Sequence, residues 1–319
     1  MINKIPAIKI ESLSKIFKTK AAPVYAVKDI SMSVEKGQIF GLLGPNGAGK
    51  TTTMQMLTTL LKPTSGKVTI AGYDLLKEPN KVRESIGYIS QIGGLENEAT
   101  ALENLILQAR LYGMSKVQAI SRAHDLIKQF ELESFAHRLV KTYSGGQRRL
   151  VDLALGIIHK PAVLFLDEPT LGLDPQNRAH LWHQIKLLRD HGTTVLLTTH
   201  YLDEADALCD QLAIVDHGTL IIQGSPGELK KHVAGDSVTL EVGAEDQATC
   251  FKILKEEPFV KDITVINNKI RLYVESGEKA LPLILKVLDG SNITMKTVSL
   301  ASPTLDDVFL SFTGRLLKD

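Results

Sequence analysis

The sequence predicts an α/β fold with a mixed β-sheet, followed by a small α+β domain in the C-terminal part of the chain. Two continuous apolar runs, Ala162 to Leu166 and Thr194 to Thr198, are typical of strands that are buried on both faces of a sheet. Helical patterns stand between the strand-like runs, and this alternation is characteristic of α/β proteins. Near residues 224–235 the pattern changes to shorter elements. We therefore expect two domains, over residues 1–230 and 235–319.

Length and composition agree with this organisation and exclude several classes of protein. The chain of 319 residues is 44% hydrophobic and 23% charged, which is ordinary for soluble globular domains. Its formal net charge of +1 gives no field that would attract nucleic acid, so we expect no nucleic-acid partner. Its 2 cysteines exclude a disulfide framework. No apolar run reaches the roughly 20 residues that a membrane-spanning helix needs, and we expect a cytoplasmic chain that does not cross a membrane by itself.

The first third of the chain is rich in expected strands. Gly37 marks a turn between two of them, and Pro63 stops the first expected helix. The expected strands are Ile8 to Leu13, Ala26 to Val34, Ile39 to Leu43, Val68 to Ile70 and Ile86 to Ser90, and the expected helix is Thr51 to Leu61. The third strand, a glycine-rich loop and this helix therefore follow one another directly.

The middle of the chain, about residues 92–160, predicts a helical subdomain. Capping boxes, in which Ser or Thr stands three residues before Glu or Gln, mark helix starts at Thr100, Ser115 and Ser144. Farther along, Asp174 followed by a proline predicts the start of another helix.

The remaining elements follow from shorter patterns. A helix and a hairpin are expected first, and strands alternate with helices after them. These segments are helix Tyr201 to Cys209, hairpin strands Leu212 to Val215 and Leu220 to Gln223 around His217-Gly218, strands Val238 to Val242, Val260 to Ile266, Ile270 to Val274 and Ile293 to Val298, helices Gln247 to Glu256 and Glu278 to Leu288, and a last helix near Thr304.

The glycine-rich loop carries the most specific motif of the sequence. Residues Gly44 to Thr51 read G-P-N-G-A-G-K-T and fit the P-loop pattern G-x-x-x-x-G-K-[ST], between a strand and a helix. Glycines let backbone N–H groups curl around a phosphate, and the helix N-terminus adds partial positive charge. We expect the phosphates of a nucleotide to bind Gly44, Pro45, Asn46, Gly47, Ala48, Gly49, Lys50, Thr51 and Thr52. The alternative is a glycine-rich turn that binds nothing.

Two carboxylates, Asp167 and Glu168, end one of the buried strands. The ends of such strands line the ligand crevice of α/β sheets. Asp167 suits the coordination shell of Mg²⁺ together with the hydroxyl of Thr51, directly or through a water. Glu168 suits a general base or a group that positions the attacking water. Alone, an Asp-Glu pair would be a solvated turn, but the P-loop favours the catalytic interpretation.

Two further polar residues stand at the ends of strands on the same edge. His200 follows the strand that begins at Thr194 and could hydrogen-bond the γ-phosphate and the attacking water. Gln91 follows the strand that begins at Ile86, where its neutral amide could touch both Mg²⁺ and water. Each residue would be unremarkable by itself, and their shared position indicates function.

The segment Tyr143-Ser144-Gly145-Gly146-Gln147 needs a separate explanation. Read locally, it is an ordinary capping box. Two glycines in the first turn, however, cost the helix about 1 kcal/mol each relative to alanine. That loss is understandable where bare backbone N–H groups must approach an anion closely.

Together these motifs resemble the ATP-binding subunits of ABC transporters, in the order typical of that family over roughly residues 7–230. By resemblance, Gly44 to Thr51 is Walker A, Gln91 the Q-loop, Tyr143 to Gln147 the ABC signature, Asp167 the Walker B aspartate, Glu168 the catalytic glutamate, Asp174 part of the D-loop and His200 the switch histidine. The signature begins with Tyr where Leu is usual. The resemblance also implies an aromatic residue that stacks on adenine, for which Phe17 matches best and Tyr25 is the alternative.

The C-terminal tail resembles one branch of the family. Ser302 to Phe309, followed by Thr313-Gly-Arg315, is similar to the end of daunorubicin-resistance-type ATP-binding subunits. In that branch a small C-terminal domain follows the ATPase, and the permease is a separate protein of the type-2 ABC export class. From the residues alone, the same tail is a capped amphipathic helix that packs on its own domain.

The resemblance implies a mechanism with ATP and Mg²⁺ as cofactors, Mg²⁺ being held by Thr51, Gln91 and Asp167. Two copies would form a head-to-tail homodimer with ATP between the P-loop of one copy and Ser144 of the other. Hydrolysis would power export of a drug-like, antibiotic or lipid-like substrate through a polytopic permease, with the protein peripheral on the inner face of the cell membrane. The region from Ile92 to Thr100 would contact the permease.

Two other classes of function are weighed against this one. A soluble ABC ATPase that acts on ribosomes or DNA is the main alternative, although the chain holds only one ATPase unit and no long coiled-coil insertion. A small-molecule kinase built on a P-loop would leave Ser144 to Gln147 unexplained. Co-purification with a membrane protein, with ribosomes or with DNA would separate these interpretations.

Overall fold

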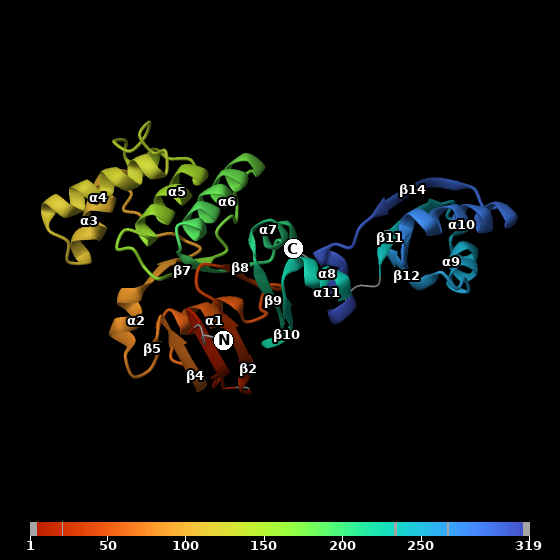
Figure 1. The fold of residues 1–319 in the computed structure, drawn as a ribbon, viewed down its shortest axis with the longest axis horizontal. Helices are drawn as coiled ribbons and strands as arrows, with labels where there is room; N and C mark the ends of the chain where they lie inside the picture. The colour runs from red at the N-terminus through yellow and green to blue at the C-terminus, as the bar shows by residue number, and fades with distance from the viewer. Residues whose placement is uncertain (1–4, 21, 233–234, 267, 315–319) are drawn as a thin grey trace. The chain divides into compact units, whose positions relative to one another are not determined.

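A computed structural model describes residues 5–20, 22–232, 235–266 and 268–314, so Arg315 of the tail motif lies outside the described residues. The chain forms two compact units, the first ending at Ser225 and the second beginning at Pro226 (Figure 1). The expected boundary lay a few residues later, after residue 230. No helix in the described ranges is long and apolar enough to span a membrane.

The first unit is built around a six-stranded mixed sheet with the order β10-β9-β3-β8-β7-β6. All neighbours in this sheet are parallel except β9 and β10, which form the expected hairpin. Its strands are β3 (Ile39–Leu43), β6 (Ile86–Ile89), β7 (Val163–Asp167), β8 (Thr194–Thr199), β9 (Gln211–Asp216) and β10 (Thr219–Gly224). Every residue of β7 and β8 is buried, as their apolar runs predicted.

A second, four-stranded antiparallel sheet has the order β2-β1-β4-β5. Helix α1 (Lys50–Leu57) lies between the two sheets (Figure 1), and its Met54 and Met56 are completely buried in the same core as Ile8 and Phe40. The strands are β1 (Ile8–Phe17), β2 (Val24–Val34), β4 (Ser65–Ile70) and β5 (Tyr73–Asp74). This packing fixes the direction in which the glycine-rich loop enters α1.

Two elements of this region differ from expectation. Strand β1 continues to Phe17 instead of Leu13, because it pairs with β2 in a long hairpin in which Phe17 lies opposite Val24. Helix α1 ends at Leu57 instead of Leu61, because Thr59 adopts a left-handed backbone conformation with φ 64° that no α-helix tolerates. The short helix α2 (Pro79–Ser85) was not predicted from the sequence.

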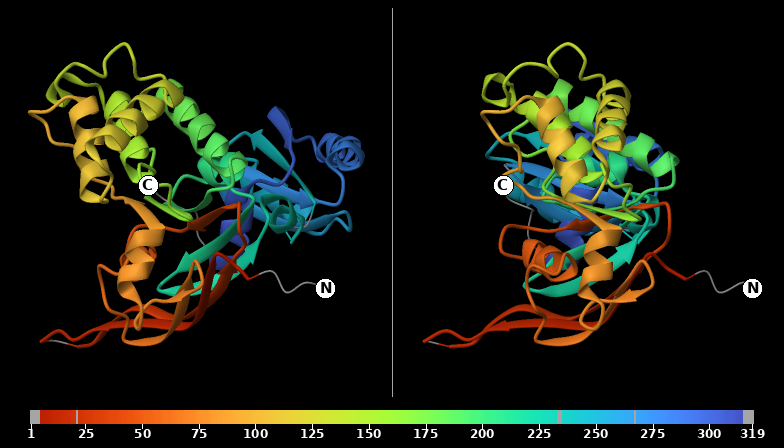
Figure 2. Two further views of the ribbon diagram at one scale, coloured as in Figure 1. Left: turned by 60° about the vertical axis from the view of Figure 1, so that its left-hand side comes forward. Right: turned by 90° about the vertical axis from the view of Figure 1, so that its left-hand side faces the viewer.

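The helical part contains α3 (Ala101–Leu111), α4 (Lys116–Gln129), the short 3₁₀ turn Val140–Thr142 and α5 (Gly145–Gly156). All three expected capping boxes are present, at Thr100, Ser115 and Ser144. Figure 2 shows these helices gathered on one side of the mixed sheet, with the antiparallel sheet on the other side. Helices α6 (Pro175–Asp190) and α7 (Leu202–Leu208) complete the first unit.

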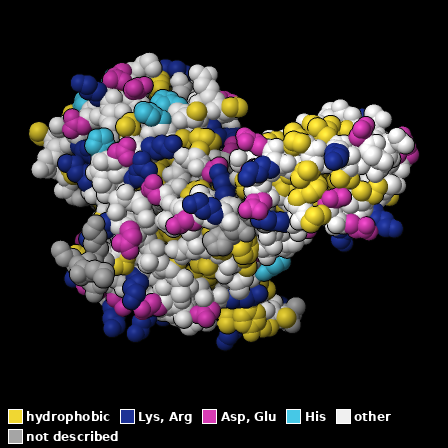
Figure 3. Space-filling model, turned by 45° about the vertical axis from the view of Figure 1, so that its right-hand side comes forward, with side chains coloured by type: hydrophobic (Ala, Val, Ile, Leu, Met, Phe, Trp, Pro, Cys, Tyr) yellow, Lys and Arg dark blue, Asp and Glu magenta, His cyan; other side chains and the backbone are white. Residues whose placement is uncertain are grey.

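The second unit is a four-stranded antiparallel sheet of order β12-β13-β11-β14 with helices packed on it. Val238, Leu272 and Ile284 belong to its own buried core, and Figure 3 shows hydrophobic and charged side chains interspersed on its visible face. Its elements are α8 (Pro226–His232), β11 (Asp236–Val242), α9 (Gln247–Lys255), β12 (Val260–Ile266), β13 (Lys269–Val274), α10 (Gly277–Gly290), β14 (Met295–Ala301) and α11 (Leu305–Thr313). Thr304 caps α11 with Asp307 in a fourth capping box.

Candidate active site

The glycine-rich loop is shaped by close main-chain approaches that only glycine permits. Gly49 has φ 100°, and a Cβ on it would clash with the carbonyl oxygen of Ala26. A Cβ on Gly44 would clash with the carbonyl oxygen of Val215. Gly49 is also the N-cap of α1 and offers no side-chain cap, so the first N–H groups of the helix stay available to an anion.

A cavity of about 140 Å³ lies over this helix start. Ala26, residues 46–52 and Glu168 line it. Of the phosphate-binding residues expected from the sequence, those from Asn46 to Thr52 line this cavity together with the carboxylate at the end of β7, whereas Gly44 and Pro45 do not. A cradle of backbone N–H groups at a helix N-terminus fits the phosphates of a nucleotide.

The side-chain ammonium of Lys50 lies at this cavity. Its side chain is only 4% exposed, and its Nζ donates hydrogen bonds to the carbonyl oxygens of Gly44 at 2.7 Å and Pro45 at 3.1 Å. Burial lowers the pKa of Lys50, while the charges of Glu168 and Asp167 oppose that shift. A buried ammonium in this position is suited to an anionic ligand.

Two of the three expected metal-binding residues, Thr51 and Asp167, meet at the end of β7, whereas Gln91 contacts Glu168 instead. Thr51 Oγ1 donates to Asp167 Oδ1 at 3.3 Å, and Thr198 Oγ1 donates to the same oxygen at 2.6 Å. Asp167 is buried, being 3% exposed. A carboxylate and a hydroxyl beside a phosphate cradle are the oxygen ligands that Mg²⁺ prefers, so the residues present fit this ion.

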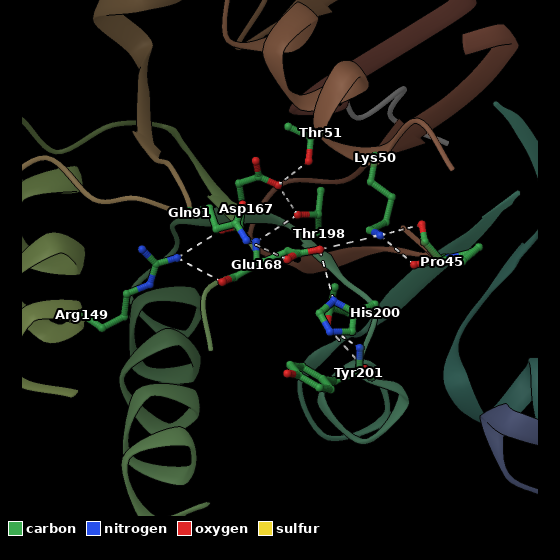
Figure 4. A network of polar contacts seen from close by, with 12 residues as sticks. Pro45, Lys50, Thr51, Gln91, Arg149, Asp167, Glu168, Thr198, His200 and Tyr201 are labelled. Atoms are coloured by element: carbon green, nitrogen blue, oxygen red, sulfur yellow. Dashed lines mark hydrogen bonds and ion pairs between the residues drawn. The ribbon is translucent and has the colours of Figure 1, made fainter. Parts of the chain in front are cut away.

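Glu168 is the point at which the expected catalytic residues converge (Figure 4). Its carboxylate oxygens lie 3.8 Å from Lys50 Nζ, 3.4 Å from Gln91 Nε2 and 3.2 Å from His200 Nδ1. The contact with His200 is a hydrogen bond when Nδ1 carries the proton.

The backbone of Glu168 adopts a strained conformation. Its φ of 46° is left-handed, which is unusual for a residue with a long side chain. Glu168 N donates to Thr198 Oγ1 at 3.0 Å, and this bond helps to hold the conformation. Thr198 therefore contacts both acidic residues, Asp167 through its carboxylate and Glu168 through its backbone N–H, and the sequence interpretation missed this role.

Arg149 is a second residue that sequence reasoning missed. It is 9% exposed and lies on α5, one turn after the glycines of the signature segment. Its guanidinium donates to four main-chain carbonyl oxygens, those of Ser90 at 2.8 Å, Asp167 at 3.1 Å, Glu168 at 3.2 Å and Pro169 at 2.6 Å (Figure 4). It thereby ties the signature helix to the strand ends that carry Gln91 and Glu168.

The signature segment and Asp174 occupy separate helix starts and do not line the P-loop cavity. Ser144 Oγ accepts from Gln147 N at 3.3 Å, and Asp174 Oδ1 accepts from Asn177 N at 2.9 Å, each capping its own helix. Tyr143 is buried, and its hydroxyl donates to the carbonyl oxygens of Phe135 at 2.7 Å and Arg138 at 3.1 Å. The ring of Tyr143 therefore belongs to the core of the helical part.

The two aromatic candidates for adenine both lie near the turn of the β1–β2 hairpin. Phe17 is 38% exposed, with Lys15 Nζ 5.1 Å from its ring centroid. Tyr25 is 53% exposed and directly precedes Ala26, which lines the cavity. Neither ring lines the cavity itself, so both residues stay candidates.

Comparison with known proteins agrees with this site. Residues 27–171 match the family model described as ABC transporter, and residues 224–313 match that of the C-terminal domain of DrrA1-3-like ATP-binding proteins. Among solved structures, the dimeric post-hydrolysis form of the ATP-binding cassette MJ0796 with ADP and Pi is 28% identical with a TM-score of 0.63. It covers 68% of this chain, and 98% of its own chain is matched. The cassette cbiO1 of Clostridium perfringens is 28% identical with a TM-score of 0.64, over 70% of this chain and 90% of its own.

Curated relatives match nearly the whole chain. The daunorubicin/doxorubicin resistance ATP-binding protein DrrA of Streptomyces peucetius is 40% identical over 98% of this chain and 94% of its own length. The linearmycin resistance ATP-binding protein LnrL of Bacillus subtilis is 35% identical over 98% of this chain and 100% of its own. Since these matches span both units, the chain is an ATPase that belongs to the ATP-binding subunits of ABC transporters, in the branch of the daunorubicin/doxorubicin-resistance proteins.

Proposed function

We propose that this protein hydrolyses Mg²⁺-bound ATP to drive export of a drug-like, antibiotic or lipid-like substrate through a separate permease. The observation that carries the proposal is the convergence of Lys50, Gln91 and His200 on the carboxylate of Glu168, beside the P-loop cavity. This set places a base, a cation and a hydrogen-bonding switch around one point.

Glu168 acts on the attacking water in this proposal. Its carboxylate accepts or orients a proton of that water, and His200 holds the carboxylate through Nδ1. Lys50 offers its ammonium to the β- and γ-phosphate oxygens in place of the carbonyl oxygens of Gly44 and Pro45. The adenine stacks on Phe17, with Tyr25 as the alternative.

Mg²⁺ is proposed to bind Thr51, Gln91 and Asp167, with Asp167 acting directly or through a water. When bound, the ion neutralises negative charge on the phosphate oxygens. The short hydrogen bond from Thr198 keeps Asp167 turned toward Thr51. Chelation by EDTA is expected to abolish hydrolysis, and restored activity on adding Mg²⁺ would support this assignment.

The second half of each ATP site is proposed to come from another copy of the chain. Ser144 and Gly145 are exposed at the start of α5, and the hydroxyl of Ser144 is still able to donate outward while its oxygen accepts from Gln147. A head-to-tail homodimer would place this helix start and Asp174 against the P-loop of the partner. The MJ0796 cassette, which is similar in fold and sequence, is described as dimeric.

The proposed class of substrate is supported by the relatives named above, whose names concern resistance to daunorubicin, doxorubicin and linearmycin. We infer a polytopic permease of the type-2 ABC export class, and a location on the inner face of the cell membrane through that permease. Residues 1–230, with a helical subdomain at about 92–160, are the proposed ATPase domain, and residues 235–319 are an accessory domain. Ile92, which is 97% exposed, begins the segment proposed to contact the permease.

The test is purification of the full chain from its native membrane in mild detergent. A polytopic membrane protein that co-purifies and stimulates ATP hydrolysis would support the proposal. Co-purification with ribosomes or DNA would favour the alternative of a soluble ABC ATPase, and absence of ATP hydrolysis with every partner would overturn both.

A further inference from the structure

Gln91 stands in a tight turn whose two ends are both bound by the signature helix α5. Gly93 N donates to the carbonyl oxygen of Ser90 at 3.2 Å, so Gln91 and Ile92 are the central residues of the turn. Gln91 reaches Glu168 (Figure 4), whereas Ile92 is 97% exposed. The turn therefore brings one side chain to the candidate active site and leaves its neighbour at the surface.

Two side chains of α5 bind this turn, one at each end. Arg149 NH1 donates to the carbonyl oxygen of Ser90 at 2.8 Å. Three residues later on the same helix, Asp152 Oδ1 accepts from Gly94 N at 3.1 Å. Residues that are three apart lie on the same face of a helix, so α5 presents both groups to the turn together.

The backbone of the turn also packs directly against Asp152. A Cβ built on Gly93 would lie 2.6 Å from Asp152 Oδ2 and 3.1 Å from Oδ1, and Gly93 has a left-handed φ of 81°. Any other residue at this position would therefore be disfavoured twice, by its backbone conformation and by the carboxylate. The hydrogen bond from Gly94 N and the close packing of Gly93 fix the chain directly after Gln91 and Ile92.

Asp152 is an expensive residue for the interior of the helical part. It is 7% exposed, and burial raises the pKa of its carboxyl, while the hydrogen bond from Gly94 N and the charges of Arg149 and Arg148 oppose that shift. Burying a carboxyl group costs free energy unless hydrogen bonds compensate for the lost water. The acidic residue is therefore better explained by the backbone that it binds than by a contribution to the stability of the core.

We propose that Asp152 is a positioning residue for ATP hydrolysis, which fixes the turn at Gly93 and Gly94 and thereby holds the amide of Gln91 beside Glu168. The inference rests on the proposed function, in which Gln91 contributes to the Mg²⁺ site. Asp152 does not line the P-loop cavity, so it acts through Gln91. The contact from Gln91 Nε2 to Glu168 is long, at 3.4 Å, and the position of the turn therefore decides where the amide lies.

The first experiment measures the rate of ATP hydrolysis by the full chain as a function of ATP concentration. The D152A variant should lower kcat by about 10- to 100-fold, the cost of a misplaced group in an active site. Its KM for ATP should stay near the wild-type value, because the P-loop is unchanged. The D152N variant keeps an oxygen that accepts from Gly94 N and should recover most of kcat.

A double-mutant cycle tests whether Asp152 acts through Gln91. The D152A/Q91A variant should be no slower than Q91A alone, because the positioned amide is already absent from Q91A. If D152A does not fold, G93A takes its place in the cycle, since its Cβ would push the turn away from Asp152. G93A should then lower kcat and be non-additive with Q91A in the same way.

Amide hydrogen exchange supplies a readout that does not depend on ATP. The Gly94 N–H should lose protection in D152A and regain it in D152N, because the acceptor is removed in one variant and restored in the other. Unchanged protection at Gly94 in D152A would show that Asp152 does not hold the turn and would overturn the inference.

Asn104 supplies the matched control. It is 6% exposed and also binds the backbone of the connection that follows Gln91, accepting from Glu96 N at 2.8 Å and donating to the carbonyl oxygens of Glu96 at 3.1 Å and Thr100 at 2.9 Å. N104A should lower the melting temperature but leave kcat near the wild-type value. Thermal unfolding of each variant identifies any loss of rate that comes from loss of fold.

The outcomes separate the inference from the proposed function. A folded D152A chain with the same kcat as N104A would overturn the inference alone. A D152A/Q91A chain that is slower than Q91A by the full factor seen for D152A would also overturn it. A wild-type chain that hydrolyses no ATP would overturn the proposed function, and hydrogen exchange at Gly94 would still show whether Asp152 holds the turn.

Discussion

The P-loop and the signature segment both place glycines at the start of a helix, but the surroundings of these glycines differ. Gly44 and Gly49 are pressed against the main chain of Val215 and Ala26, so the shape of the P-loop is explained within the chain. Gly145, by contrast, is exposed, and the nearest atom to a Cβ built on it is Leu173 Cδ2 at an ordinary 3.8 Å.

The two glycines of the signature segment also differ from each other in their surroundings. A Cβ on Gly146 would clash with the side chain of Asn177, which hydrogen-bonds Asp174, so Gly146 is required for the close packing of α5 on α6. Gly145 lacks such an internal reason among the described residues. The proposed dimer would explain its conformational cost, because the partner chain would present a nucleotide phosphate to Ser144 and Gly145.

The strongest test of the P-loop half is Glu168→Gln. The amide cannot accept a proton from water and loses the ion pair with Lys50, so kcat should fall by about 10²- to 10⁴-fold. Affinity for ATP should persist, because the P-loop is unchanged, and the ATP-bound dimer should accumulate. ATP hydrolysis, equilibrium binding and light scattering measure the three quantities, and a kcat within a factor of about two of wild type would contradict the role of Glu168.

The strongest test of the signature half is Ser144→Arg. The large cation would fill the exposed N-cap of α5 and block a partner's nucleotide, so hydrolysis should fall by about 100-fold or more. Binding of ATP to the monomer should persist, because Ser144 does not line the P-loop cavity. If the monomer lost its ATP affinity instead, Ser144 would belong to the pocket of its own chain.

The division between the two signature glycines is tested by a matched pair of alanine variants. G145A should raise stability by up to about 1 kcal/mol through helix propensity while lowering the rate of hydrolysis. G146A should lower the free energy of unfolding by about 1–3 kcal/mol, because its Cβ overpacks against Asn177. Urea unfolding and ATPase rates measure both, and equal effects of the two substitutions would remove the distinction drawn here.

The smallest expected effect is that of Tyr143→Phe. This change removes the hydroxyl bonds to Phe135 and Arg138 and should cost only about 0.5–1.5 kcal/mol of stability, the net value of a typical hydrogen bond, because the carbonyl oxygen of Phe135 still accepts from Arg138 N. Turnover at saturating ATP should remain near wild type in a folded sample. A loss of turnover without a loss of stability would place Tyr143 in the ATP site after all.

Local rules predicted much of this molecule. Capping boxes gave the starts of α3, α4 and α5, and apolar runs gave the buried strands β7 and β8. The convergence on Glu168 followed from motif positions, because parallel strands end at a common edge of the sheet. These features depend on a few neighbouring residues or on the direction of the strands.

Features set by distant contacts were not predictable in the same way. The length of β1 depends on its pairing with β2. Arg149 looks like a solvated helical arginine in the sequence, since the carbonyl oxygens that it binds come from two other segments. Whether an arginine is solvated or buried is decided by packing, which composition and periodicity do not report.

The contacts of Arg149 have a consequence for how sequences of this kind can diverge. Among the described residues, its guanidinium donates hydrogen bonds only to main-chain oxygens, which every residue type provides. Ser90 and Pro169 can therefore be exchanged for other residues without removing an acceptor, whereas no other side chain offers five donors in a planar fork. The sequence constraint therefore falls on the arginine alone. We expect the arginine to be retained in relatives whose neighbouring loops differ in sequence. Covariation between pairs of positions would not reveal this contact.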